Sequence, residues 1–189
     1  MSAIRPKPAS SALVIIDVQD KLLAAMPNDA QERVLRVCNQ LVTGASALAV
    51  PVFLTEQYPK GLGHTAEALE PHLHGAGVGP ERRFEKTHFS AMDVPEFRSA
   101  LDGGYTDVFV VGMEAHICVH QTVRDLCEAG YRTHVVSDGT CSRQDEHRRI
   151  AEGLWTRSGA SVTCGEAVLF DWLGKAGGDA FKAISRAIR

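Results

Sequence analysis

Short runs of apolar residues alternate with longer amphipathic stretches along most of the chain. The runs are rich in Val, Ile, Leu and Phe and are bounded by polar or glycine-containing segments, which is typical of buried β-strands. They lie at 12–17, 51–55, 107–112, 133–138 and 160–164, with a weaker run at 81–87. Between them, apolar residues recur every three or four positions, so the pattern predicts helices at 29–49, 93–101, 119–129 and 145–157.

Two helical regions carry more specific signals. Asp93 is a candidate cap for the helix at 93–101, and Pro95 falls in its first turn, where a missing N–H is tolerated. The tail from 166 to 189 has a helical pattern interrupted by the glycine-containing stretch "GKAGGD". We therefore expect the tail to form two helical pieces.

The alternation of strands and helices determines the expected fold class. Strands that are apolar along their whole length are buried on both faces, so they point to a parallel sheet with helices on each side. We expect one α/β domain over 1–189, with a core at about 10–170 and a helical tail at 171–189. In such open sheets, ligands bind beyond the carboxyl ends of the strands.

Composition limits the classes of function. Hydrophobic residues make up 44% of the chain and charged residues 23%, as in ordinary globular proteins, and the net charge of -3 argues against nucleic acid as a partner. No apolar run is long enough to span a bilayer, and the N-terminal sequence lacks a signal-peptide pattern. The five cysteines are odd in number and have no C-x-x-C spacing. These features predict a cytoplasmic protein with free thiols that acts on a small molecule, without a nucleic-acid or membrane partner.

Three reactive side chains follow predicted strands at the edge where a site is expected. Asp17 ends the run "LVIID", Lys86 follows the weak run in "RRFEKTHFS", and Cys118 comes just after "VFVVG". The carboxylate can accept the thiol proton, while the ammonium can stabilise the thiolate. Cys118 also starts a predicted helix, whose free N–H groups can bind a developing oxyanion.

Each of these residues also has an ordinary structural explanation. Cysteine is among the most buried residue types, so Cys118 can be a packing residue. Asp17 can cap the following helix, and a lysine such as Lys86 is usually a solvated surface charge. The pattern alone therefore leaves catalysis and ordinary structure open.

Five segments resemble the isochorismatase-like cysteine hydrolases in sequence, order and spacing over about residues 10–170. They are "ALVIIDVQDKL", "PVFLTEQYPKGLG", "FEKTHFSAM", "VVGMEAHICVHQTVRDLCEAGY" and "VVSDGTCSR". The chain looks closest to the branch called isochorismatase domain-containing proteins. The resemblance implies a three-layer α/β/α sandwich with a Rossmann-like six-stranded parallel sheet. It also implies an Asp–Lys–Cys triad, here Asp17, Lys86 and Cys118.

The same resemblance implies further features of the site. It places a cis peptide bond at Met113–Glu114 and an oxyanion hole formed by the N–H groups of Glu114 and Cys118. Residues beside the triad are candidates for substrate contacts: Gln19, Tyr58, His88, Phe89 and His116. Gln19, Tyr58 and Phe89 can equally be packing residues. Relatives are usually dimers or larger, so we expect a homo-oligomer.

The remaining cysteines are assigned to different roles. Cys38 and Cys127 fall on apolar helix faces and are expected in the core. Cys164 ends a predicted strand and is expected to be buried, whereas Cys141 follows the fifth strand and can approach the site. Among the five thiols we expect Cys118 to be alkylated most readily near neutral pH.

The eight histidines raise the question of a metal site. Metal-binding relatives such as nicotinamidases carry an Asp-x-His pair after the second strand. Alignment on Pro59 puts Glu56 and Tyr58 at those positions, and a tyrosine is a poor substitute for histidine at a divalent site. Further histidines lie in a glycine-rich segment at 61–79, which is predicted to be a loop, and are expected to be solvated: His64, His72 and His74. We expect no metal and no cofactor.

The leading hypothesis is a hydrolase that cleaves a small amide or related C–N bond through a thioester on Cys118. A rival hypothesis is hydrolysis of a vinyl ether such as isochorismate, which the cysteine disfavours because true isochorismatases lack it. A catalytically silent scaffold and a redox-responsive thiol protein also stay open. The sequence does not name the substrate.

Overall fold

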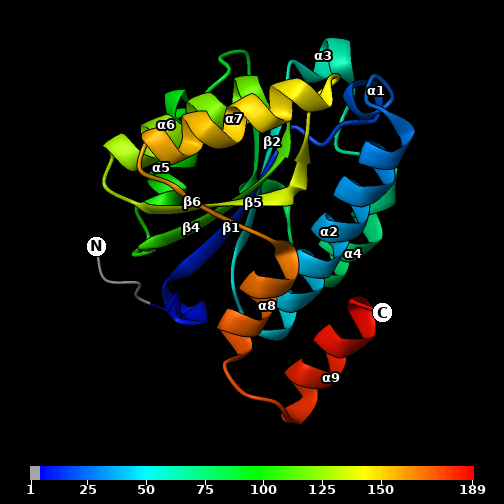
Figure 1. Ribbon diagram of the computed structural model, residues 1–189, viewed down its shortest axis with the longest axis vertical. Helices are drawn as coiled ribbons and strands as arrows, with labels where there is room; N and C mark the ends of the chain where they lie inside the picture. Colours follow the sequence, from blue (N-terminus) through cyan, green and yellow to red (C-terminus); the bar gives the residue numbers. More distant parts are fainter. Residues whose placement is uncertain (1–4) are drawn as a thin grey trace.

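The computed structural model describes residues 5–189, which form a six-stranded sheet with helices on both faces (Figure 1). All neighbouring strands are parallel, in the order β3-β2-β1-β4-β5-β6. The strands are β1 Ser11–Ile16, β2 Val52–Gln57, β3 Arg83–Lys86, β4 Asp107–Met113, β5 Arg132–Cys141 and β6 Ser161–Thr163. The predicted fold class is confirmed.

Nine α-helices connect and flank the strands within the described residues. They are α1 Asp20–Leu23, α2 Asn28–Ala47, α3 Pro59–Leu62, α4 Glu70–Gly75, α5 Pro95–Leu101, α6 His120–Glu128, α7 Asp145–Arg157, α8 Gly165–Leu173 and α9 Gly178–Ala187. Short 3-10 turns lie at Pro8–Ser10, Glu67–Leu69, Pro80–Arg82 and Ala91–Asp93, and a π-helical turn lies at Ala115–Val119. Between residues 5 and 189, no helix combines the length and apolar character needed to cross a membrane.

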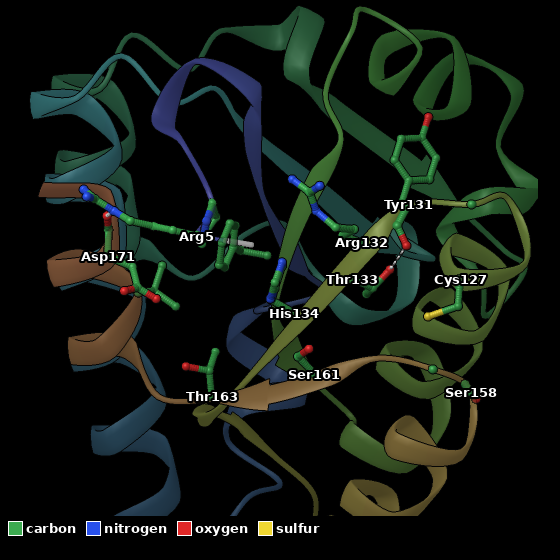
Figure 2. A pocket seen from close by; sticks show the side chains of 15 residues that line it. Arg5, Cys127, Tyr131, Arg132, Thr133, His134, Ser158, Ser161, Thr163 and Asp171 are labelled. Carbon is green, nitrogen blue, oxygen red and sulfur yellow. Dashed lines mark hydrogen bonds between the residues drawn. The ribbon is translucent and has the colours of Figure 1, made fainter. Parts of the chain in front are cut away.

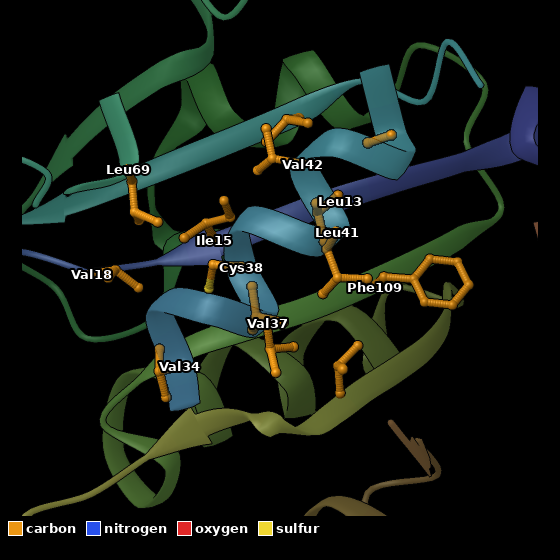
Figure 3. Close-up of a cluster of buried hydrophobic side chains, with 14 of the residues drawn as sticks. Leu13, Ile15, Val18, Val34, Val37, Cys38, Leu41, Val42, Leu69 and Phe109 are labelled. Atoms are coloured by element: carbon orange, nitrogen blue, oxygen red, sulfur yellow. The ribbon is translucent and has the colours of Figure 1, made fainter. Parts of the chain in front are cut away.

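The sheet separates two hydrophobic clusters because successive strand side chains point to opposite faces. In the central strand β1, Leu13 and Ile15 contribute to the cluster under α2, α4, α8 and α9 (Figures 1 and 3). Val14 and Ile16 contribute to the second cluster, under α5, α6 and α7. Both faces of the strand are therefore excluded from water, which explains its uninterrupted apolar sequence.

Helix α2 buries the face that its apolar spacing predicts. Val34, Cys38, Leu41 and Ala45 are all fully buried against the sheet, and most of them are visible in Figure 3. Leu48, the last position of the predicted face, lies just beyond the helix and is only partly buried. The helical tail forms two helices, α8 and α9, as predicted, and α9 packs on α2.

Two local predictions differ from the structure. The stretch at 61–79 is not a continuous loop, because α3, α4 and a 3-10 turn occupy much of it. Leu69 and Leu73 in this stretch are fully buried, which supplies the hydrophobic contact that holds these short helices. Asp93 does not cap α5: it ends a 3-10 turn that the Ser90 side chain caps by accepting from the Met92 N–H.

The strand order places the switch in crossover direction between β1 and β4. Chain connections run from β1 outward through β2 and β3, then return to β4 and continue outward to β6. In doubly wound sheets the crevice at such a switch point is the usual ligand site. The residues that follow β1 and β4 therefore border the expected site.

Candidate active site

The carboxyl edge of the sheet brings together the three residues that the sequence singles out. Asp17 directly follows β1, Lys86 is the last residue of β3, and Cys118 lies in the π-helical turn between β4 and α6. Lys86 and Asp17 are 69 positions apart in the chain. Parallel strands end at a common edge, and this geometry makes the residues neighbours.

Asp17 and Lys86 form a buried ion pair. Lys86 Nζ lies 2.6 Å from Asp17 Oδ2, and both side chains are fully shielded from solvent. The second carboxylate oxygen, Oδ1, accepts a hydrogen bond of 2.7 Å from Thr55 Oγ1. Desolvating two charges is costly, and such a pair persists only where further hydrogen bonds satisfy the remaining polar atoms.

The Lys86 ammonium has several further acceptors around it. Nζ donates to Gln57 Oε1 at 2.6 Å and lies 3.1 Å from the Phe89 carbonyl and 3.3 Å from the His88 carbonyl. The segment after β3 thus wraps around the ammonium. The alternative explanation, that this lysine is an ordinary solvated charge, does not hold, because only 4% of the residue is exposed.

The Cys118 thiol is buried beside this pair. Burial, and to a smaller extent the charge of Asp17, raise the pKa of the thiol to about 12, while Lys86 lowers it by less. At neutral pH the resting group is therefore a protonated thiol rather than a thiolate. The Asp17 carboxylate lies beside this sulfur and is a group able to accept its proton.

The peptide bond between Met113 and Glu114 is cis, as expected from the family resemblance. The Glu114 side chain points away from solvent, and its Oε2 accepts from the Arg143 backbone N–H at 3.1 Å and from Arg143 Nε at 3.0 Å. This ion pair joins the turn carrying Cys118 to the segment after β5. The participation of the Glu114 and Cys118 N–H groups in an oxyanion hole stays a prediction.

The five predicted substrate contacts fall into different environments. Tyr58 and Phe89 are the most exposed large aromatic residues near the carboxyl edge, at 54% and 51% exposure. His88 is also exposed. Gln19 is fully buried and bonds backbone atoms of Gln57. Gln19 therefore has a structural function, while the first three lie where a ligand can reach them.

His116 is half-buried and belongs to a polar cluster. Its Nδ1 lies 2.9 Å from Ser142 Oγ, and its ring centroid is 4.5 Å from that of His147. Burial, together with His147 and Arg143, lowers the pKa of His116, against an opposing effect of Glu114. The imidazole is therefore neutral at physiological pH and can donate or accept a hydrogen bond.

Several residues of the site were not identified from sequence. Thr55 and Gln57 contact the ion pair, and Ser142 and Arg143 contact His116 and Glu114. A signal for the first two does exist, since they are polar residues two positions apart at the end of an apolar strand and share one face. No local pattern marks the second pair.

Glu56 and Tyr58 do not offer a divalent-metal site. Glu56 Oε1 accepts from the Thr65 N–H and the Thr65 hydroxyl, both at 2.7 Å, and Oε2 lies 2.9 Å from His64 Nδ1. Both carboxylate oxygens are thus occupied by chain atoms, and the Tyr58 side chain is largely in solvent. Across residues 5–189, no three His, Cys, Asp or Glu side chains are grouped as metal ligands. His72 and His74 lie on α4 rather than in a loop.

The remaining cysteines partly follow expectation. Cys38 is buried in the core and Cys127 is half-buried, whereas Cys164 is exposed, which contradicts its expected burial. Cys164 follows the short edge strand β6, so no further strand covers it. Cys141 is buried at the end of β5, where burial raises the pKa of its thiol to about 12. Cys164 is therefore the accessible thiol, and it competes with Cys118 in any labelling experiment.

A groove of about 750 Å³ lies at the opposite, amino-terminal end of the strands (Figure 2). It exists because β6 begins beside His134, so the first residues of β5 have no outer neighbour. Arg132 and His134 border it and both bond the buried carboxylate of Asp107. None of the predicted site residues lines this groove, and two of its basic side chains, Arg132 and His134, are already paired with Asp107. The buried Asp17–Lys86 ion pair beside Cys118 at the carboxyl edge is the stronger candidate for chemistry.

Comparison with known proteins gives concordant results. A family model described as "Isochorismatase domain" matches residues 11–167. Isochorismatase domain-containing protein 1 of Salmo salar is 35% identical over 184 residues, which are 96% of this chain and 62% of that protein. Isochorismatase domain-containing protein 2 of Pongo abelii is 35% identical over 199 residues, covering 100% of this chain and 90% of that protein. The solved structure described as MAR1 ribonuclease from Caenorhabditis elegans has a TM-score of 0.89 and 34% identity, covering 98% of this chain and 92% of that one. The chain therefore spans less than two thirds of the Salmo salar protein.

Proposed function

The chain belongs to the isochorismatase family, and on that premise we propose that it is a cysteine hydrolase cleaving a small amide or related C–N bond. Asp17, Lys86 and Cys118 act as the triad, with no cofactor. The observation that carries the proposal is the buried 2.6 Å ion pair between Lys86 and Asp17 beside the Cys118 thiol. Burying two charges next to a cysteine serves no evident packing purpose, because apolar residues would fill the same space at lower cost.

In the first half-reaction, Asp17 accepts the thiol proton as Cys118 attacks the substrate carbonyl. The C–S bond forms, and the carbonyl oxygen becomes an oxyanion that accepts hydrogen bonds from the backbone N–H groups of Glu114 and Cys118. Asp17 then passes the proton to the leaving nitrogen, the C–N bond breaks, and the amine departs. A thioester on Cys118 remains, so one hard hydrolysis is divided into two easier steps.

In the second half-reaction, water hydrolyses the thioester. Asp17 again acts as base and takes a proton from the water molecule while the water oxygen attacks the thioester carbonyl. Collapse of the tetrahedral intermediate breaks the C–S bond, releases the acid and returns the proton to the sulfur. A raised thiol pKa suits this cycle, because the proton moves within the site instead of being lost to solvent at rest.

Lys86 has an electrostatic function in both steps. Its ammonium offsets the negative charge that Asp17 and the sulfur share during proton transfer. Because its side chain is excluded from water, the interaction is screened much less than at a surface. Thr55 supports the arrangement by fixing the second carboxylate oxygen.

The experiment that tests the proposal is a screen of small amides with wild type and Cys118→Ala, combined with intact mass measurement. We expect turnover of at least one amide by wild type, an acyl adduct on Cys118, and no turnover by the variant. Chelation should leave the activity unchanged. A Cys118→Ala variant that keeps full activity would refute thioester catalysis.

The same screen distinguishes two rival activities. Vinyl ether hydrolysis mainly requires protonation of a carbon, so full hydrolysis of isochorismate by Cys118→Ala, with no amide turned over by wild type, would favour it. The Caenorhabditis elegans relative is described as a ribonuclease, so single-stranded and duplex RNA belong in the panel. The net charge of -3 does not favour that activity here.

We further propose a homo-oligomer of cytoplasmic location, with a small molecule as the ligand. The two exposed aromatic side chains, Tyr58 and Phe89, lie at the carboxyl edge and offer apolar contact area to a substrate or a second subunit. Light scattering of wild type and Phe89→Ala tests the oligomer. A monomer at every concentration would contradict it.

A further inference from the structure

We propose that Gln57 is a positioning residue, a neutral acceptor that holds the Lys86 ammonium toward Asp17 and Cys118 without adding a second negative charge. The inference rests on the proposed triad and extends it to the strand between the two ends of the ion pair. Gln57 is the last residue of β2, which lies between β1 and β3 in the sheet. In register it pairs with Lys86 itself.

The ammonium geometry gives Gln57 its importance. A lysine ammonium has three N–H groups and no acceptor. Four oxygens surround Lys86 Nζ, and the two nearest, both at 2.6 Å, are Asp17 Oδ2 and Gln57 Oε1. One hydrogen then remains for the Phe89 and His88 carbonyls, which lie further away, or for the sulfur. Asp17 and Gln57 each take one N–H group, so together they fix the direction of the remaining N–H group.

Gln57 is itself held in one orientation. Its Nε2 donates to the Thr87 carbonyl at 2.9 Å, which turns the amide oxygen toward Lys86. Its backbone is clamped by the Gln19 side chain, since the Gln57 N–H donates to Gln19 Oε1 at 2.8 Å and Gln19 Nε2 donates to the Gln57 carbonyl at 3.1 Å. Gln19 also reaches the Gly63 carbonyl. The acceptor is thus pre-organised before any substrate arrives.

The chemistry explains why an amide is used. The ion pair and the thiol together carry no net charge, and proton transfer from sulfur to Asp17 keeps that total unchanged. A glutamate at this position would add a negative charge next to the ammonium. Lys86 would then be shared between two carboxylates, and thiolate formation would be opposed by an extra repulsion.

The test measures alkylation of Cys118 by iodoacetamide as a function of pH, resolved by peptide mass spectrometry. It needs no substrate. Below the titration midpoint the alkylation rate follows the thiolate fraction, so an upward shift of one pH unit slows the reaction about tenfold at fixed pH. The exposed Cys164 in the same sample is the internal reference.

Gln57→Glu should slow Cys118 alkylation relative to Cys164 at least about tenfold at pH 8. The matched control is Gln40→Glu, which makes the same change at a half-buried amide on α2 whose Nε2 bonds the Ala187 carbonyl. That control should leave the ratio unchanged. A Gln57→Glu profile that coincides with the Gln40→Glu profile would overturn the inference.

A second variant guards against loss of the fold. Gln57→Met keeps the length of the side chain but has no oxygen acceptor, and thermal melting establishes that it is folded. Its Cys118 alkylation should also slow severalfold relative to Cys164, and an unchanged ratio would contradict the positioning function. Shifted alkylation without hydrolysis of any amide would leave this inference standing and remove the proposed reaction. Hydrolysis of an amide with unshifted alkylation would support the proposed reaction and overturn the positioning function of Gln57.

Discussion

Removing the Lys86 ammonium should destabilise the protein strongly, and most of the loss should come from the charge left behind. Lys86→Met keeps the side-chain length but leaves the fully buried Asp17 carboxylate without its cation. Breaking a buried pair in this way costs about 3–5 kcal/mol, whereas replacing both partners with neutral groups is often close to neutral. The variant also loses the hydrogen bond to Gln57.

The comparison that isolates this effect is a double-mutant cycle. Asp17→Asn/Lys86→Met should be about 1–3 kcal/mol more stable than Lys86→Met alone, because the neutral amide can lie in the same site without an unpaired charge. Thr55 Oγ1 can still donate to the amide oxygen at position 17. The free energy of unfolding of all four proteins is measured by urea denaturation at pH 7.

A Lys86→Met variant that loses less than about 1 kcal/mol, or a double variant less stable than it, would refute the reasoning. Either result would mean that the pair is hydrated in solution.

Three further predictions concern single positions. Asp17→Asn should lower kcat by about 10²- to 10⁴-fold in an amide assay while near-UV circular dichroism stays unchanged, because it removes the base but keeps the shape; a loss below threefold would contradict the triad. Hydrogen bonding to Glu56 raises the pKa of His64, so the stability from this contact is present below the unfolded pKa of about 6.5 and is lost as pH rises through the folded value. His64→Ala should therefore lower the urea midpoint more at pH 6 than at pH 8.5, and an equal loss at both would refute the pairing. Gly112→Ala should cost about 3 kcal/mol or more, since φ is +117° and a Cβ would meet the Ile16 carbonyl oxygen at 2.0 Å; a thermal melt within about 2 °C of wild type would contradict this.

The alternation of apolar strands and amphipathic helices was sufficient to predict the layers of the fold. The helix at 145–157 was predicted with its observed bounds, and α2 lies within two residues of the predicted range. These elements are readable because burial of a strand or a helix face imposes a local periodicity on the sequence. The residues Asp17, Lys86 and Cys118 were found from the same pattern, since each follows a strand, and from the motifs of the family.

The environment of those residues was decided by tertiary structure alone. The contacts of Lys86 join it to Asp17 across 69 positions and to Gln57 across 29, and local periodicity carries no information about such pairings. Tertiary packing also sets the surroundings of the thiols: Cys118 is buried with a raised pKa, while Cys164 is exposed after the short edge strand β6. The sequence specifies which side chains reach the carboxyl edge, because strand direction is a local property. How far solvent reaches these side chains depends on the packing of the whole chain. Their protonation in turn depends on the burial and the neighbouring charges that this packing creates.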